Sequence, residues 1–226
     1  MEFMFDTANI EVIRKYIDVF PITGITSNPS IIKKEGKIDF FNHFKEIRSI
    51  IGFDKSMHIQ VVATDCEGIV KDAKTILDKI DDKVYVKIPV TEDGLKAMRI
   101  LKSEGVGITA TAVYTKAQAL LALETGADFI APYFNRMENS DMDPRSTIKM
   151  IADMIDRYGY KTKILAASFK NIGQVMDAFS AGAQTATVAP EILCGSVKMA
   201  SIKEAVENFT SDWKSIFGKG ISISDL

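Results

Sequence analysis

Several residue types and patterns are scarce or absent in this 226-residue chain. Its only cysteines, Cys66 and Cys194, show no Cys-x-x-Cys spacing and are too few for a disulfide framework. Neither charge sign dominates, because 28 Lys and Arg stand against 30 Asp and Glu, which gives no support for a nucleic-acid-binding surface. No set of His, Asp and Glu has metal-ligand spacing, so a metal site is not expected either.

The chain also lacks the hydrophobic runs of membrane proteins. Its first residues, Met1–Asp6, include an acidic residue where a signal peptide needs a positive charge, and no apolar run approaches a membrane span. We therefore expect a cytoplasmic protein with no membrane partner. With 46% hydrophobic and 26% charged residues, the chain has an ordinary globular composition, and we expect one domain over residues 1–226.

What the chain does have is a regular alternation of short β-rich runs and longer amphipathic stretches. The strand candidates are 3–6, 24–27, 58–62, 84–88, 107–111, 129–133, 164–168 and 185–188. Helix starts are indicated by Asp65, Thr91 and the pair Asp143–Pro144. Eight such units predict an α/β fold, a single (β/α)8 barrel. A doubly wound sheet is the alternative, but no strand is followed by a Gly-x-Gly-x-x-Gly turn.

Polar residues follow most of the predicted strands, at the end where a barrel of this kind has its active site. They are Asp6, Thr26 with Asn28, Gln60, Lys87, Thr111, Tyr133 with Arg136, and Ser168 with Lys170. Taken singly, each has a structural explanation: Asp6 or Asn28 as a helix cap, Thr111 as a β-branched filler. Their coincidence at one level of the barrel favours a functional site.

Lys87 is the most unusual of these residues, because it interrupts the apolar run 84–90. An ammonium buried there is costly, so its pKa falls and the neutral amine becomes a nucleophile that can condense with a carbonyl. A lysine at a strand edge that reaches water is the alternative. An iminium on Lys87 would act as the electron sink of an aldol cleavage, with Tyr133, Gln60 and Thr111 holding a water that relays protons. His58 is expected to line the barrel rather than to catalyse.

Arg136, Ser168 and Lys170 follow the sixth and seventh strands, near the place where barrels often bind phosphate. Arginine offers a pair of donors and lysine a point charge, a combination that suits a phosphate dianion. We therefore expect a sugar-phosphate substrate. The alternative is that Arg136 and Lys170 are solvated loop cations.

Five motifs, in order along nearly the whole chain, resemble the transaldolase family. They are Asp6-Thr7-Ala8-Asn9, Gly24-Ile25-Thr26-Ser27-Asn28-Pro29-Ser30, Val86-Lys87-Ile88-Pro89-Val90-Thr91, Thr109-Ala110-Thr111-Ala112-Val113-Tyr114 and Ala166-Ala167-Ser168-Phe169-Lys170. Within that family the chain resembles the short branch that contains fructose-6-phosphate aldolase and the small transaldolases.

The resemblance implies a barrel whose Schiff-base lysine lies on the fourth strand, the position of Lys87. It also implies that Asp6 and Asn28 contact substrate hydroxyls and that Arg136 and Ser168 bind phosphate. Many transaldolases have an arginine at the position of Lys170, which weakens that assignment. Family members often form homo-oligomeric pentamers or decamers through a C-terminal helix, the role expected here of residues 202–217 with Trp213; packing of Trp213 against its own barrel is the alternative.

Two positions distinguish the activities of this branch. Transaldolases of this type generally have glutamate at the position of Gln60 and phenylalanine at that of Tyr133. The resemblance therefore predicts a cofactor-free class I aldolase that cleaves fructose 6-phosphate to dihydroxyacetone and glyceraldehyde 3-phosphate, with Thr26 among the residues that orient hydroxyls. A transaldolase that passes the three-carbon unit to erythrose 4-phosphate is one alternative, and a non-catalytic sugar-phosphate-binding barrel is another.

Overall fold

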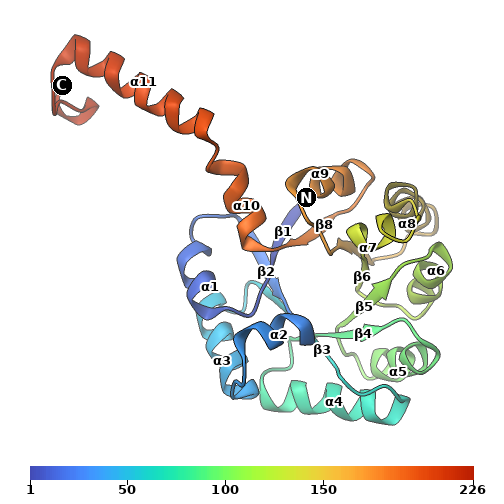
Figure 1. The fold of residues 1–226 in the computed structure, drawn as a ribbon. Coiled ribbons are helices and arrows are strands. Elements are labelled where there is room, and N and C mark those ends of the chain that lie inside the picture. Colours follow the sequence, from blue (N-terminus) through green and yellow to red (C-terminus); the bar gives the residue numbers. More distant parts are fainter. The chain divides into compact units, whose positions relative to one another are not determined.

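The computed structural model describes residues 1–226, and its first part is a closed barrel of eight parallel strands (Figure 1). The strands pair in sequence order, and β8 closes the barrel on β1. Their bounds are β1 Glu2–Asp6, β2 Ile22–Thr26, β3 Ser56–Gln60, β4 Tyr85–Pro89, β5 Ile108–Val113, β6 Phe129–Pro132, β7 Lys163–Ala166 and β8 Thr185–Val188. The (β/α)8 barrel predicted from the sequence is confirmed.

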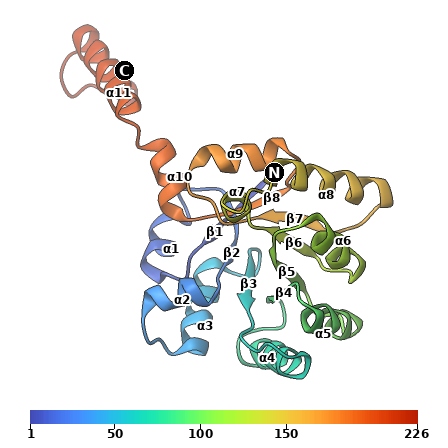
Figure 2. The same ribbon diagram turned by 45° about the vertical axis from the view of Figure 1, so that its right-hand side comes forward.

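Helices surround this barrel, as both ribbon views show (Figures 1 and 2). They are α1 Ile10–Tyr16, α2 Pro29–Glu35, α3 Phe40–Ile51, α4 Cys66–Lys79, α5 Glu92–Ser103, α6 Lys116–Glu124, α7 Phe134–Glu138, α8 Pro144–Tyr158 and α9 Ile172–Ser180. The three predicted helix starts are confirmed: the side chains of Asp65, Thr91 and Asp143 each accept a backbone N–H in the first turn of the helix that follows.

The predicted strand positions are right, but their ends differ by up to two residues. β3 ends at Gln60 instead of Val62, because the N–H groups of Val62 and Ala63 bind the Asp72 carboxylate and not a neighbouring strand. Gln60 is therefore the last residue of its strand. Gln60 pairs with Lys87, and Lys87 with Thr109, so these residues of β3, β4 and β5 lie at one level of the barrel.

Three packed rings fill the barrel below Lys87. His58 stacks on Tyr85 with ring centroids 4.9 Å apart, and Phe129 meets both rings edge-on. The imidazole nitrogens of His58 are hydrogen-bonded to Thr109 and Ser56 at 2.8 and 2.9 Å. Burial lowers the pKa of His58 well below its usual value. His58 thus lines the barrel interior, as the sequence predicted.

Close packing also explains two glycines that position the site. A Cβ on Gly94 would lie 2.0 Å from the carbonyl oxygen of Pro89, so only glycine lets α5 begin this close to the end of β4. A Cβ on Gly24 would lie 2.2 Å from the Ser56 hydroxyl inside the barrel. Both glycines therefore allow neighbouring elements to approach more closely than any other residue would.

Residues 191–226 form a second compact unit, separate from residues 1–190. It contains most of α10 (Pro190–Val197), all of α11 (Ala200–Phe217) and the 3-10 turn Ile223–Asp225. Within this unit the Trp213 indole donates to the carbonyl of Ile221 at 2.8 Å and packs on Phe217. No helix of the chain combines the length and apolar composition that crossing a membrane requires. A single domain over 1–226 stays a prediction.

Candidate active site

A pocket of about 300 Å³ lies at the carboxyl ends of the barrel strands. It is lined by Asp6, Asn28, Pro29, Ser30, Gln60, Lys87, Ala112, Tyr133, Arg136, Ala167 and Ser168. Seven of the ten site residues predicted from the sequence are in this lining. The structure therefore brings together side chains from β1, β3, β4 and β5 and from the segments that follow β2, β6 and β7.

Lys87 lies in the middle of β4, and its side chain is only 3% exposed. Burial lowers the pKa of Lys87, while the nearby Asp6 carboxylate acts in the opposite direction. A lowered pKa increases the fraction of neutral, nucleophilic amine at neutral pH. The lysine therefore has the burial that a Schiff-base nucleophile needs, and it does not reach bulk solvent at a strand edge.

Asp6 is held by a chain of two threonines. The Thr26 hydroxyl donates to Asp6 Oδ1 at 2.7 Å, and Thr187 Oγ1 lies 2.6 Å from Thr26 Oγ1. Because the Thr26 proton is used on Asp6, the Thr187 hydroxyl donates to Thr26. Burial raises the pKa of Asp6, against the Lys87 charge and the Thr26 hydrogen bond, which lower it. Thr26 thus lies behind Asp6 rather than in the pocket lining.

Asn28 serves two purposes with one side chain. Its Oδ1 accepts the N–H groups of Ser30 and Ile31 at 2.9 and 3.1 Å, so it caps α2, as its structural explanation proposed. The residue also lines the pocket. Since the oxygen is occupied by the cap, the amide Nδ2 is the group left to donate to a ligand.

Tyr133 is paired with Thr111, whose hydroxyl lies 3.0 Å from the phenol oxygen. Burial raises the pKa of Tyr133, so the phenol keeps its proton at neutral pH. In the same pocket lining, the side-chain oxygen of Gln60 is buried and has no hydrogen-bonding partner in the protein. A buried acceptor of this kind is suited to a water molecule or a substrate hydroxyl.

Arg136 is held by two tyrosines. Its NH1 donates to the Tyr114 hydroxyl at 3.0 Å, and its guanidinium lies 4.9 Å from the centre of the Tyr133 ring. The hydrogen bond that Arg136 donates to Tyr114 raises the pKa of Arg136, so the guanidinium stays charged at any working pH. Sequence reasoning assigned no role to Tyr114 or Thr187. Their signals were weak: Tyr114 follows β5 inside a family motif, and Thr187 is one more threonine on β8.

Two lining residues have backbones in the left-handed region, Ala112 at φ 55° and Ser168 at φ 66°. A non-glycine residue there costs roughly 1–3 kcal/mol and persists where its surroundings hold it. The Ser168 carbonyl accepts the N–H of Asn135, and the Ala112 carbonyl accepts from Gln118 Nε2. Both of these left-handed residues line the pocket.

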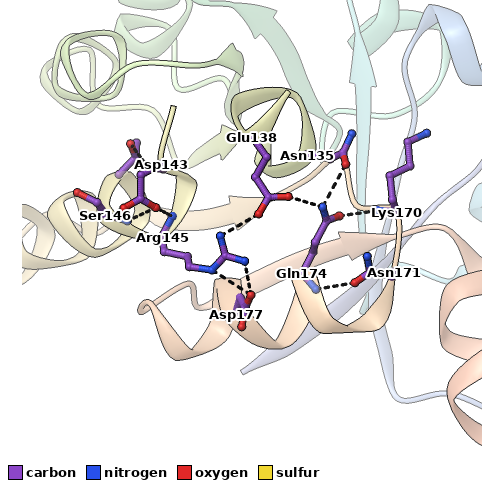
Figure 3. Close-up of polar contacts among 10 residues, drawn as sticks. Asn135, Glu138, Asp143, Arg145, Ser146, Lys170, Asn171, Gln174 and Asp177 are labelled. Atoms are coloured by element: carbon purple, nitrogen blue, oxygen red, sulfur yellow. Dashed lines mark hydrogen bonds and ion pairs between the residues drawn. The ribbon is translucent and has the colours of Figure 1, made fainter. Parts of the chain in front are cut away.

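Lys170 is the predicted site residue that the structure places least favourably. Its side chain is exposed and is not in the pocket lining. Its backbone N–H donates to Gln174, and the side chain extends away from that contact (Figure 3). Phosphate binding by Lys170 stays a prediction. No group of three or more His, Cys, Asp or Glu side chains is arranged to hold a metal ion.

Comparison with known proteins gives concordant results. The family described as Transaldolase/Fructose-6-phosphate aldolase matches residues 3–225. A probable fructose-6-phosphate aldolase of Streptococcus pneumoniae is 49% identical over 94% of this chain and 96% of its own length. Probable transaldolases of Clostridium acetobutylicum and Agathobacter rectalis are 38% and 37% identical, over 97% and 96% of this chain and 100% of their own lengths.

The burial of Lys87 predicts a pH-dependent stability. Because its folded pKa lies below its usual value of 10.5, the unfolded chain binds more protons between these two values. The free energy of unfolding of the wild type, relative to Lys87→Met, should therefore increase as the pH rises through that window. Urea denaturation at a series of pH values measures it. When Asp6→Asn is added to both the wild type and Lys87→Met, the pKa of Lys87 should fall further, and the pH range over which the stability difference changes should widen. A stability difference that does not change with pH would contradict the effect of burial.

Proposed function

The chain belongs to the transaldolase/fructose-6-phosphate aldolase family, and on that premise we propose that it is a class I aldolase that cleaves fructose 6-phosphate. The products are dihydroxyacetone and glyceraldehyde 3-phosphate, and the reverse addition uses the same groups. The observation that carries this proposal is the Lys87 amine, buried at 3% exposure and opening into a pocket of polar groups.

In the proposed mechanism the neutral amine of Lys87 adds to the C2 carbonyl of the ketose, and loss of water gives an iminium. Removal of the proton from the C4 hydroxyl breaks the C3–C4 bond, and its electron pair moves to the iminium nitrogen. Glyceraldehyde 3-phosphate leaves and an enamine remains on Lys87. Protonation of the enamine carbon and addition of water then release dihydroxyacetone and restore the amine.

Tyr133 is the proposed source of the proton that the enamine carbon receives, and a water molecule relays it. Its raised pKa keeps the phenol protonated, and Thr111 at 3.0 Å fixes the direction of the hydroxyl. The unpartnered Gln60 oxygen supplies an acceptor for the same water. Asp6, held by Thr26, and the Asn28 amide orient the substrate hydroxyls.

The phosphate of the substrate is assigned to Arg136 and Ser168. Arg136 is the cation of the pocket wall beyond Tyr133, and Ser168 faces the pocket from the loop after β7. A phosphate there would receive charge-assisted hydrogen bonds from the guanidinium. Lys170 would contribute only long-range attraction, because its side chain is exposed outside the lining.

We further propose that the chain forms homo-oligomers through α11. No residue of this 18-residue helix is buried, and it exposes an apolar stripe at Ile202, Val206, Phe209 and Ile216. Light scattering should give a mass in solution of several times the 25.0 kDa of one chain. Val206→Lys with Phe209→Lys should lower it, while Lys203→Ala on the same helix should not. A monomeric wild type would contradict this assembly.

Covalent trapping tests the role of Lys87 and separates an enzyme from a non-catalytic barrel. Borohydride added with dihydroxyacetone should reduce the iminium and leave a three-carbon mass increment on Lys87, located by peptide mass spectrometry. Lys87→Met should abolish the increment, with folding checked by circular dichroism. Lys83, four residues earlier and outside this pocket, should stay unmodified. An increment on another lysine would remove the mechanism.

Release of glyceraldehyde 3-phosphate from fructose 6-phosphate, with and without erythrose 4-phosphate, decides between the two activities. Steady release without acceptor is expected; release only with erythrose 4-phosphate would identify a transaldolase.

Tyr133→Phe should slow cleavage roughly 10²-fold, the lower end of what a positioned acid contributes, and should favour transfer of the three-carbon unit to erythrose 4-phosphate. Tyr158→Phe, at an exposed tyrosine that ends α8 outside the pocket lining, is the matched control and should change neither cleavage nor transfer. Unchanged partitioning in Tyr133→Phe would refute this role.

A further inference from the structure

Gln174, on α9, holds together the two segments that carry the phosphate-binding residues (Figure 3). Its side-chain oxygen accepts the backbone N–H of Lys170 at 2.8 Å. Its amide nitrogen donates to Asn135 Oδ1 at 3.1 Å and to Glu138 Oε2 at 2.6 Å. The residue is 8% exposed. Both amide protons and the amide oxygen are therefore used, and in only one orientation, because the Lys170 N–H can bind only the oxygen.

The two segments meet at the site itself. Arg136 lies on α7 between the two residues that accept from Gln174, and Ser168 precedes Lys170 by two residues. A backbone hydrogen bond of 2.9 Å from Asn135 to the Ser168 carbonyl joins the segments a second time. The distance between the Arg136 and Ser168 backbones is thus set by these contacts.

An ion-pair ring supports Gln174 from the solvent side. Glu138 Oε1 accepts from Arg145 NH1 at 2.8 Å, and Arg145 Nε donates to Asp177 at 3.0 Å. Asp177 lies on α9, one turn after Gln174, so the ring returns to the helix from which it started (Figure 3). Arg145 and Asp177 are 47% and 44% exposed, so water screens their interaction, and the buried amide is the part least sensitive to salt.

We propose that Gln174 is a positioning residue that fixes the spacing between Arg136 and Ser168 and thereby controls how well the pocket holds a phosphorylated aldehyde. This inference rests on the proposed function for the phosphate itself. The acid–base group is held independently: the Tyr133 N–H binds the Val113 carbonyl and the Phe134 N–H binds the Ala167 carbonyl. Gln174 should therefore affect binding of the phosphate end and leave proton transfer intact.

The test compares glyceraldehyde 3-phosphate with unphosphorylated glyceraldehyde as acceptors for dihydroxyacetone. Gln174→Met keeps the side-chain length and removes all three hydrogen bonds. It should raise KM for glyceraldehyde 3-phosphate roughly tenfold, the loss expected when one charge-assisted hydrogen bond is misplaced. Its kcat, and kcat/KM for glyceraldehyde, should stay within about twofold of the wild type.

Gln184→Met is the matched control, since the Gln184 side chain accepts one backbone N–H, from Ile164 near the start of β7. That contact is at the barrel end opposite the pocket, so neither acceptor should be affected. A second experiment exchanges the side chains of Gln174 and Glu138 and tests whether discrimination between the two acceptors is restored. Gln174→Glu sets a carboxylate against Glu138 and should lose phosphate discrimination; adding Glu138→Gln returns a donor to the contact and should restore it.

Three results would overturn the inference. They are an equal loss for both acceptors in Gln174→Met, which would indicate general distortion; no change for either acceptor; and failure of Glu138→Gln to rescue Gln174→Glu. Failure of the proposed function gives a different result, because a wild type that does not distinguish the two acceptors would refute the phosphate site and with it this role.

Discussion

The structure depends on one electrostatic constraint: an amine and a carboxylate are enclosed in the same barrel. Burial works against the charge on both Lys87 and Asp6, lowering the pKa of the first and raising that of the second, while each favours the ionised form of the other. The neighbouring polar groups include the Thr26 hydroxyl, which donates to Asp6, and the Gln60 and Asn28 amides of the pocket lining, while Arg136 adds a further positive charge to that lining. The lowered pKa of Lys87 and the raised pKa of Asp6 are thus two results of the same burial, and the attraction between the two charges limits both.

Much of the barrel could be predicted from the sequence, because the alternation of β-rich and amphipathic runs is a local property. The strand count, the capping by Asp65, Thr91 and Asp143, and the gathering of polar residues at one end all follow from it. The strand ends could not be predicted, since the end of β3 depends on the Asp72 carboxylate, ten residues away from Val62.

The residues that support the site could not be predicted from the sequence either. Thr187 acts on Asp6 through Thr26, which lies 161 residues away along the chain, and Gln174 connects to Glu138 across 36. Nothing in the local pattern distinguishes these residues from ordinary strand threonines or helix glutamines. The left-handed backbone at Ser168 is equally hidden, because the Ser168 carbonyl bonds to Asn135, on a segment that it meets only in the closed barrel.

The packed rings of His58, Tyr85 and Phe129 close the barrel below Lys87, so the amine can be reached only from the mouth of the pocket. Whatever binds the amine must therefore enter and leave through the same opening.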